Sequence, residues 1–174
     1  MTASVGRASA RIGLLGNPGD LYGGKVLAAT IDAFETVATV TQTVFYAPAS
    51  FQPDVANLQR LAVDRVAPSK GAIALGLTSD VPLQSGLSGS SAILLATLRA
   101  LDAHLNLGLD PLEMAQIAWD IERKDLGVVA GPQDRVIQAL GGLQYMDFSG
   151  PDEIGIHEAL DPDLLPPMLV AWPK

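Results

Sequence analysis

The sequence has 174 residues, of which 48% are hydrophobic and 17% charged, and this composition suits one packed domain without disordered segments. Its formal net charge of -8 excludes a broad nucleic-acid-binding face, because such a face needs a concentrated basic surface and the chain has only 11 Lys and Arg. The absence of cysteine excludes disulfides, thiolate metal sites and a cysteine nucleophile. Neither a secretory signal pattern nor an apolar run of about eighteen residues is found, so we expect no membrane contact and a cytoplasmic location.

The first part of the chain predicts strands separated by a turn-rich loop. Residues 1–10 are small and polar and are interpreted as a loose leader before a single domain over residues 11–174. Apolar or Val- and Thr-rich composition predicts strands over residues 11–15, 26–31 and 35–45. Between the first two lies GNPGDLYGG, residues 16–24, whose composition is typical of turns.

The second part mixes helices and strands. Apolar residues at helical spacing predict helices that begin at Asp54, after a loop over residues 82–92, at Asp110 and at Pro132. Strands are predicted over residues 71–77, 143–148 and 167–172. Because strands and helices do not alternate regularly, we expect an α+β fold in which helices cover mainly one face of a sheet. An uncovered terminal strand would promote self-association.

The glycine- and serine-rich loop of residues 82–92, PLQSGLSGSSA, runs directly into an apolar series at helical spacing. The first backbone N–H groups of a helix have no partner inside it, glycine lets a ligand approach the main chain, and the helix dipole favours an anion. We therefore predict that this loop holds nucleotide phosphates. The alternative is a tight turn with a serine cap, and the GxxxxGK[ST] spacing of a P-loop is absent.

Two carboxylates in the second half are candidate site residues. Glu122 lies near the C-terminal end of the helix that begins at Asp110, where an anion is unfavourable unless a cation such as magnesium is nearby. Asp134 lies at a helix start, and a carboxylate there can orient or deprotonate an attacking hydroxyl. The alternatives are a solvated glutamate on a helix surface and an ordinary acidic residue of a first helical turn.

The loop of residues 16–24 offers polar groups for a second ligand. Asn17 and Asp20 are of the kind that hydrogen-bond to sugar hydroxyls, although Asn and Asp also form turns for backbone reasons alone. Arg11 lies just before this loop and is a further candidate; the alternative is that it is an ordinary charged residue on the surface.

Taken together and in this order, these segments resemble the GHMP small-molecule kinases. ARIGLLGNPGDLYGG is similar to the substrate-side first motif of that superfamily, and GLSGSSA is similar to its phosphate-binding second motif. GVVAGPQDR, followed by GGLQYMDFS and LLPP, resembles the glucuronokinase branch most. The resemblance implies an α+β fold similar to the second domain of ribosomal protein S5, with helices mainly on one face of the sheet. It also leads us to expect that the C-terminal domain of the family, with its third glycine-rich motif, is absent from this chain.

The resemblance implies roles for the residues of the loop. In such kinases this loop wraps the ATP phosphates, which assigns that role to Gly86, Leu87, Ser88, Gly89, Ser90 and Ser91. One of the last two serines would bind Mg²⁺, together with Glu122 as the second metal ligand.

The resemblance also implies roles on the side of the phosphate acceptor. Asp134 takes the place of the catalytic aspartate, and Arg11 that of the basic residue beside it. Asn17 and Asp20 correspond to positions that contact the sugar. An anionic sugar needs a cation as well, and the sequence assigns neither Arg11 nor Lys25 to that role.

The activity that follows from this resemblance is that of an ATP-dependent sugar kinase with Mg²⁺ as cofactor. Glucuronic acid, phosphorylated at its anomeric hydroxyl, is the substrate that we expect first. The alternatives are another GHMP kinase acting on a different sugar or small alcohol, and a fragment that binds a nucleotide or a partner without turnover. As partners we expect ATP, a small sugar or uronic acid, and a second copy of the chain or a separate C-terminal half, but neither nucleic acid nor a membrane.

Overall fold

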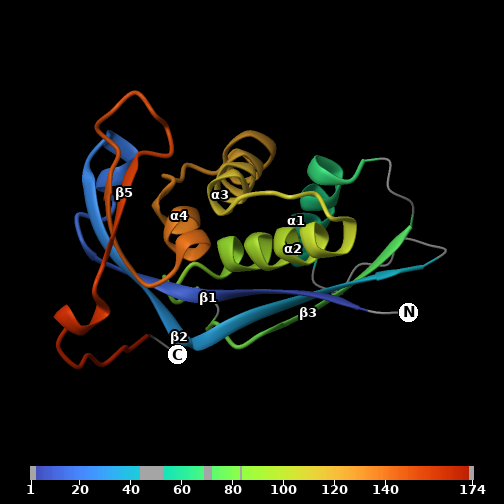
Figure 1. Cartoon of the computed structure of the whole chain (residues 1–174), viewed down its shortest axis with the longest axis horizontal. Coiled ribbons are helices and arrows are strands. Elements are labelled where there is room, and N and C mark those ends of the chain that lie inside the picture. Colours follow the sequence, from blue (N-terminus) through green and yellow to red (C-terminus); the bar gives the residue numbers. More distant parts are fainter. Residues whose placement is uncertain (1–2, 44–52, 69–71, 83, 173–174) are drawn as a thin grey trace.

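The computed structural model describes residues 3–43, 53–68, 72–82 and 84–172. In these residues, an antiparallel sheet of five strands carries four α-helices on one face (Figure 1). In chain order, the elements are β1 (Ser4–Leu15), β2 (Lys25–Gln42), α1 (Pro53–Val66), β3 (Ile73–Ser79), α2 (Gly89–Leu105), α3 (Pro111–Asp120), α4 (Gln133–Leu140), β4 (Leu143–Asp147) and β5 (Ile156–Leu160). Two short 3-10 helices, Gly19–Tyr22 and Pro162–Leu164, and a π-helical turn, Ile121–Asp125, complete the set. The predicted α+β fold with helices on one face is confirmed.

Strand β2 is the central strand of the sheet. One of its edges pairs with β1 over most of its length. The other edge pairs with β4 near its start, at residues 25–29, and with β3 near its end, at residues 36–42. Strand β5 extends the sheet beyond β4. The single strand β2 therefore connects the two halves of the sheet.

The pairing of β1 with β2 is interrupted by a bulge in the middle of both strands. Ser9 lies opposite Glu35, but the next residue, Ala10, lies opposite Ile31, so residues 32–34 of β2 have no partner in β1. Such bulges bend a strand and increase its local twist. The two separate strands that the sequence predicts here are thus one strand with a bulge between them, and the last residues of that prediction, beyond Thr43, lie outside the described residues.

Helix α2 packs across β1 and β2 and supplies much of the core. Its fully buried leucines recur at helical spacing: Leu94, Leu95, Leu98 and Leu101. Burying each such side chain stabilises the fold by about 1.5 to 3 kcal/mol. Gly6 of β1 permits this packing, because a Cβ atom there would lie 2.0 Å from a backbone oxygen of α2. Among the described residues, no helix is both long and apolar enough to cross a membrane.

The predicted leader over residues 1–10 is wrong from Ser4 onward. Those residues form the first half of β1: Ala8 is buried in the core with the helices, and Ala10 is buried in a smaller cluster with Val81 and Leu87. Small side chains are needed there because α2 lies so close to the sheet, and this small-residue composition was misinterpreted as that of an unstructured segment.

The predicted terminal strand over residues 167–172 is also wrong. The segment has no regular secondary structure, which is consistent with Pro167 at its start, whose backbone nitrogen cannot donate to a sheet ladder. Instead, Trp172 packs edge-on against Phe34 of the β2 bulge, with ring centroids 5.0 Å apart. Strand β5 could not be predicted from the sequence, because its side chains are mostly exposed and show no apolar alternation.

Candidate active site

The glycine- and serine-rich loop leads into the N-terminus of α2, as predicted. Gly86 and Ser88 both adopt the left-handed backbone conformation, with φ of 76° and 62°, and this turns the chain into the helix. Ser88 occupies the N-cap position, but its side chain makes no capping hydrogen bond. It donates to Asp134 instead. The Ser88 side chain therefore does not serve as a helix cap.

A cavity of about 710 Å³ lies beside this loop, and we call it the loop cavity. Its walls come from the loop, from the first turns of α1, from the end of β3 and from Ile93 of α2. Loop residues such as Gly86 and Ser90 face it together with apolar side chains such as Leu58 and Leu77. This combination of backbone donors and apolar walls suits a ligand with a phosphate group and a flat apolar part.

Glu122 is buried behind the loop serines, with 3% of its surface exposed. It lies on the π-helical turn that continues α3. Its carboxylate accepts hydrogen bonds from Ser90 Oγ at 2.8 Å and from Ser91 Oγ at 3.5 Å. Arg135 of α4 donates to the same carboxylate through Nε, at 2.5 Å, and forms an ion pair with it through Nη2. The alternative of a solvated surface glutamate is thereby excluded.

Asp134, in the first turn of α4, is held by Arg11 of β1. The guanidinium Nε and Nη2 donate to the two carboxylate oxygens at 2.6 and 2.5 Å, which is the bidentate geometry of a strong pair. Arg11 Nη1 also donates to the carbonyl oxygen of Gly86, 2.7 Å away, so the same side chain fixes the loop. Burial alone would raise the pKa of Asp134, but the hydrogen bonds and charge of Arg11 and the hydroxyl of Ser88 hold it below its ordinary value. Asp134 is therefore ionised at neutral pH.

Asn17 and Asp20 lie on the other side of Asp134, where Gln133 connects them. The Gln133 side chain donates from Nε2 to Asn17 Oδ1 at 2.6 Å, and its backbone N–H donates to Asp20 Oδ2 at 3.2 Å. Burial raises the pKa of Asp20; the hydrogen bond from Gln133 opposes this shift and the charge of Asp134 adds to it. Gly131 packs so closely on the Asp20 carboxylate that a Cβ atom would lie 2.0 Å from it.

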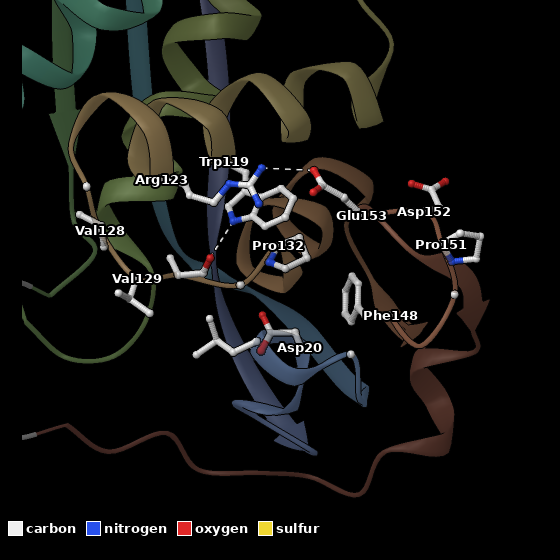
Figure 2. Close-up of a pocket in the computed structure, with 16 residues that line it drawn as sticks. Asp20, Trp119, Arg123, Val128, Val129, Pro132, Phe148, Pro151, Asp152 and Glu153 are labelled. Carbon is white, nitrogen blue, oxygen red and sulfur yellow. Dashed lines mark hydrogen bonds and ion pairs between the residues drawn. The ribbon is translucent and has the colours of Figure 1, made fainter.

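A second cavity, of about 550 Å³, opens next to Asp20 (Figure 2). We call it the acceptor cavity. Its walls are the segment of residues 127–132, the end of α3 with Trp119, and the loop after Phe148. The indole Nε1 of Trp119 donates to the carbonyl oxygen of Ala130 at 2.7 Å and so holds the first of these walls in place. Asp134 lines neither cavity itself, but it contacts Ser88, which lines the loop cavity, and follows two residues after Pro132, which lines the acceptor cavity.

The structure thus brings the candidate side chains into three neighbouring hydrogen-bonded groups, centred on Asp134, on Glu122 and on Gln133. Two residues of this site, Arg135 and Gln133, were not predicted. Arg135 binds Glu122, and Gln133 binds Asn17 and Asp20. Arg135 Nη1 also donates to the carbonyl oxygen of Gly131 at 2.8 Å, and so connects Glu122 to the loop that covers Asp20. The one available signal was position, because both residues flank Asp134 in the segment GPQDR.

The oxygen atoms of Ser90, Ser91 and Glu122 are a donor set that suits Mg²⁺. This ion prefers oxygen ligands and is held in nucleotide sites by one or two carboxylates together with substrate phosphates. No group of three or more His, Asp or Glu side chains that could hold a metal ion occurs in the described parts of the chain.

Fold and site together define an α+β domain in which a glycine- and serine-rich loop leads into a buried helix. The chain belongs to the GHMP kinase family: residues 55–142 match the model of the GHMP kinases N terminal domain. This match covers most of helix α1, the glycine- and serine-rich loop, Glu122 and Asp134, and confirms the family resemblance.

Individual relatives extend this likeness over nearly the whole chain. Glucuronokinase 1 of Arabidopsis thaliana is 33% identical over 93% of this chain and 55% of its own length. D-glycero-alpha-D-manno-heptose 7-phosphate kinase of Campylobacter jejuni is 46% identical over 40% of this chain and 21% of its own. The crystal structure of a D-glycero-D-manno-heptose 1-phosphate kinase from Bacteriodes thetaiotaomicron superposes with a TM-score of 0.78 and 27% identity, over 92% of this chain and 60% of that one. The chain thus spans less than two thirds of the length of these relatives.

Proposed function

We propose that this protein is an ATP-dependent sugar kinase that transfers the γ-phosphate of ATP to a sugar hydroxyl. The observation that carries the proposal is the position of Asp134, which contacts the phosphate-type loop through Ser88 and lies next to the acceptor cavity through Gln133 and Asp20. An ionised carboxylate between a phosphate site and a polar cavity is the arrangement that phosphoryl transfer to an alcohol needs.

On the phosphate side, the loop and the N-terminus of α2 bind the ATP phosphates through backbone N–H groups and serine hydroxyls. Arg11 anchors the loop through Gly86 and holds Asp134 at the same time. Because phosphoryl transfer depends mainly on positioning and electrostatics, this fixed geometry does much of the catalytic work.

On the acceptor side, Asp134 orients the attacking hydroxyl and accepts its hydrogen bond. Its pKa is held low by Arg11, so it acts mainly by positioning and by its charge, and it takes the hydroxyl proton late in the reaction. Asp20 and Asn17 hold further sugar hydroxyls, with Gln133 fixing both side chains.

The residues present fit a magnesium ion at Ser90, Ser91 and Glu122. When bound with ATP, the ion neutralises charge on the phosphates. Within the protein, Glu122 accepts hydrogen bonds from both serines and is oriented by Arg135.

As substrate we propose glucuronic acid, phosphorylated at its anomeric hydroxyl. The support is the 33% identity to a glucuronokinase over 93% of this chain. A heptose phosphate is the second candidate, favoured by the 46% identity to a heptose 7-phosphate kinase over a shorter segment.

The test is a coupled assay of ATP consumption over a panel of sugars, uronic acids and sugar phosphates. We expect turnover with an anionic sugar, and a loss of kcat by about 10²- to 10⁴-fold in Asp134→Asn, while binding of MgATP in calorimetry is retained. Asp64→Asn, on the exposed face of α1, is the matched control and should leave kcat unchanged. Unchanged turnover in Asp134→Asn would remove this residue from the mechanism. No turnover and no heat of ATP binding in the wild type would instead favour a fragment without catalytic activity.

A further inference from the structure

The acceptor cavity contains a single cationic side chain among its described lining residues, that of Arg123. Lys25, a cation close in sequence to the first loop, does not line the cavity; it is exposed and pairs with Asp147 at 3.2 Å. Arg11 is occupied by Asp134. Any negatively charged group that enters this cavity therefore meets Arg123.

The guanidinium of Arg123 is held in place by stacking. It lies over the ring of Trp119, 4.0 Å from the ring centroid, at the upper wall of the cavity in Figure 2. Trp119 is itself fixed by its core packing and by its hydrogen bond to Ala130. Stacking of this kind leaves the edge of the guanidinium available, and this edge matches the two oxygens of a carboxylate or phosphate.

A carboxylate already occupies part of that edge. Glu153 Oε2 lies 3.2 Å from Arg123 Nη2, and Asp120 Oδ1 lies 3.8 Å from the same nitrogen. Among the described residues, no hydrogen bond engages Nε or Nη1. Glu153 comes from the loop after Phe148, and 60% of its side chain is exposed. An exposed pair of this kind contributes at most about 1 kcal/mol, so a ligand carboxylate can replace it at little cost.

We propose that Arg123 binds the negatively charged group at the end of the sugar substrate that is distant from the phosphorylated hydroxyl, and that this group replaces Glu153 on the guanidinium. The chemical class is a sugar with a terminal oxyanion, either a carboxylate or a phosphate. This inference rests on the proposed kinase function and adds the residue that selects the substrate.

The two ends of such a sugar fit the two ends of the cavity. Asp20, at the lower wall in Figure 2, lies close enough to Asp134 for the two charges to interact, so hydroxyls held there are near the phosphate site. Arg123 lies across the cavity from Asp20, beyond Pro132. The cavity of about 550 Å³ is of the size that small-ligand sites have, roughly 300 to 1,000 Å³. A neutral sugar uses Asp20 equally well but gains nothing from Arg123.

The experiment compares kcat/KM for glucuronate, glucose and glucose 6-phosphate in the wild type, Arg123→Met and Glu153→Gln. Arg123→Met keeps the packing on Trp119 but removes the charge, and we expect kcat/KM for the anionic substrate to fall by ~10- to 100-fold with that for glucose nearly unchanged. Glu153→Gln removes the competing carboxylate, and KM for the anionic sugar should fall, up to about fivefold. Arg60→Met, which breaks an exposed Arg–Asp pair on α1, is the control and should change neither.

The comparison of glucuronate with glucose 6-phosphate shows whether Arg123 binds a carboxylate or a phosphate, since the two sugars differ in this group. An equal loss for glucose and for both anions in Arg123→Met would show a structural role and overturn the proposal. An unchanged KM for the anionic sugar in Glu153→Gln would refute the replacement of Glu153 by the substrate on Arg123. This variant also keeps the proposal testable if Arg123→Met fails to fold.

Calorimetric binding of the same three sugars without ATP separates this inference from the kinase proposal. Binding of an anionic sugar that depends on Arg123, without turnover, would refute the kinase function and support the site. Turnover without any preference for an anionic sugar would leave the kinase function standing and refute the site. Absence of binding of either anion to the wild type would refute the site whatever the turnover.

Discussion

Replacing Arg135 by methionine tests whether the buried charges behind the phosphate loop are arranged as described. The side chains of Arg135 and Glu122 are 5% and 4% exposed, and the guanidinium contacts the carboxylate through two nitrogens. Methionine has a similar length and fills most of the same space, so the main effect is that Glu122 stays buried without its cation. Two serine hydroxyls alone do not compensate a buried carboxylate.

The expected cost is large because breaking a buried pair on one side usually lowers the free energy of unfolding by about 3 to 5 kcal/mol. With a urea m-value of about 2 kcal/mol/M for a domain of this size, the unfolding midpoint should fall by about 1.5 to 2.5 M. An exposed pair is worth no more than about 1 kcal/mol, so the control Arg60→Met should shift the midpoint by less than about 0.5 M.

Urea unfolding followed by circular dichroism measures these midpoints. The double variant Arg135→Met with Glu122→Gln removes both charges, and we expect it to unfold at a higher urea concentration than Arg135→Met alone. The reasoning would be refuted if Arg135→Met were no less stable than Arg60→Met, or if the double variant were less stable than the single one, because the carboxylate would then not be buried beside the guanidinium.

Three further variants examine the metal site, the acceptor side and the packing of α2. Glu122→Gln should raise the Mg²⁺ concentration that half-saturates ATP binding by ~10-fold or more, and an unchanged Mg²⁺ dependence would remove this residue from the metal site. Asp20→Asn should raise the melting temperature at pH 7. The pKa of Asp20 is raised in the folded state, so its ionised form lowers the stability of the wild type at any pH above that pKa. The increase in melting temperature should therefore shrink as the pH falls toward the ordinary Asp value of 3.8. A gain that is constant with pH would contradict this. Gly6→Ala should destabilise the fold by ~2 kcal/mol or more in thermal unfolding, whereas Gly150→Ala, where the added carbon meets open space, should be nearly neutral.

The parts of the fold that could be predicted are those in which local sequence patterns determine the structure. Helix α3 illustrates this: the Asp110 side chain accepts from two backbone N–H groups of the first turn, and Glu113 completes a capping box, as the sequence at the predicted start indicates. The path of β2 could not be predicted in the same way, because whether a strand continues through a bulge depends on its partner strand. The exposed β5 also forms only because the edge of β4 is available to it.

For the site, the motif residues lie near one another in the structure, but several of their side-chain partners could not be predicted from the sequence. The loop serines were assigned to the neighbourhood of Glu122, and both lie within hydrogen-bond distance of it. Burial of Arg135 was not predictable, since an arginine in an amphipathic helix next to an aspartate is normally exposed. Its partner lies on another helix, and only the packing of α3 against α4 reveals it.

The course of β2 through the sheet divides its amide hydrogens into two protected groups. The first half of the strand pairs with β1 and β4, and the second half pairs with β1 and β3. Residues 32–34, between the two halves, have no partner in β1, β3 or β4. Amide hydrogens outside a ladder exchange with solvent through small local openings, whereas those of a paired strand exchange only when a larger cooperative unit opens. We therefore expect residues 32–34 to take up deuterium faster than the paired residues on either side of them.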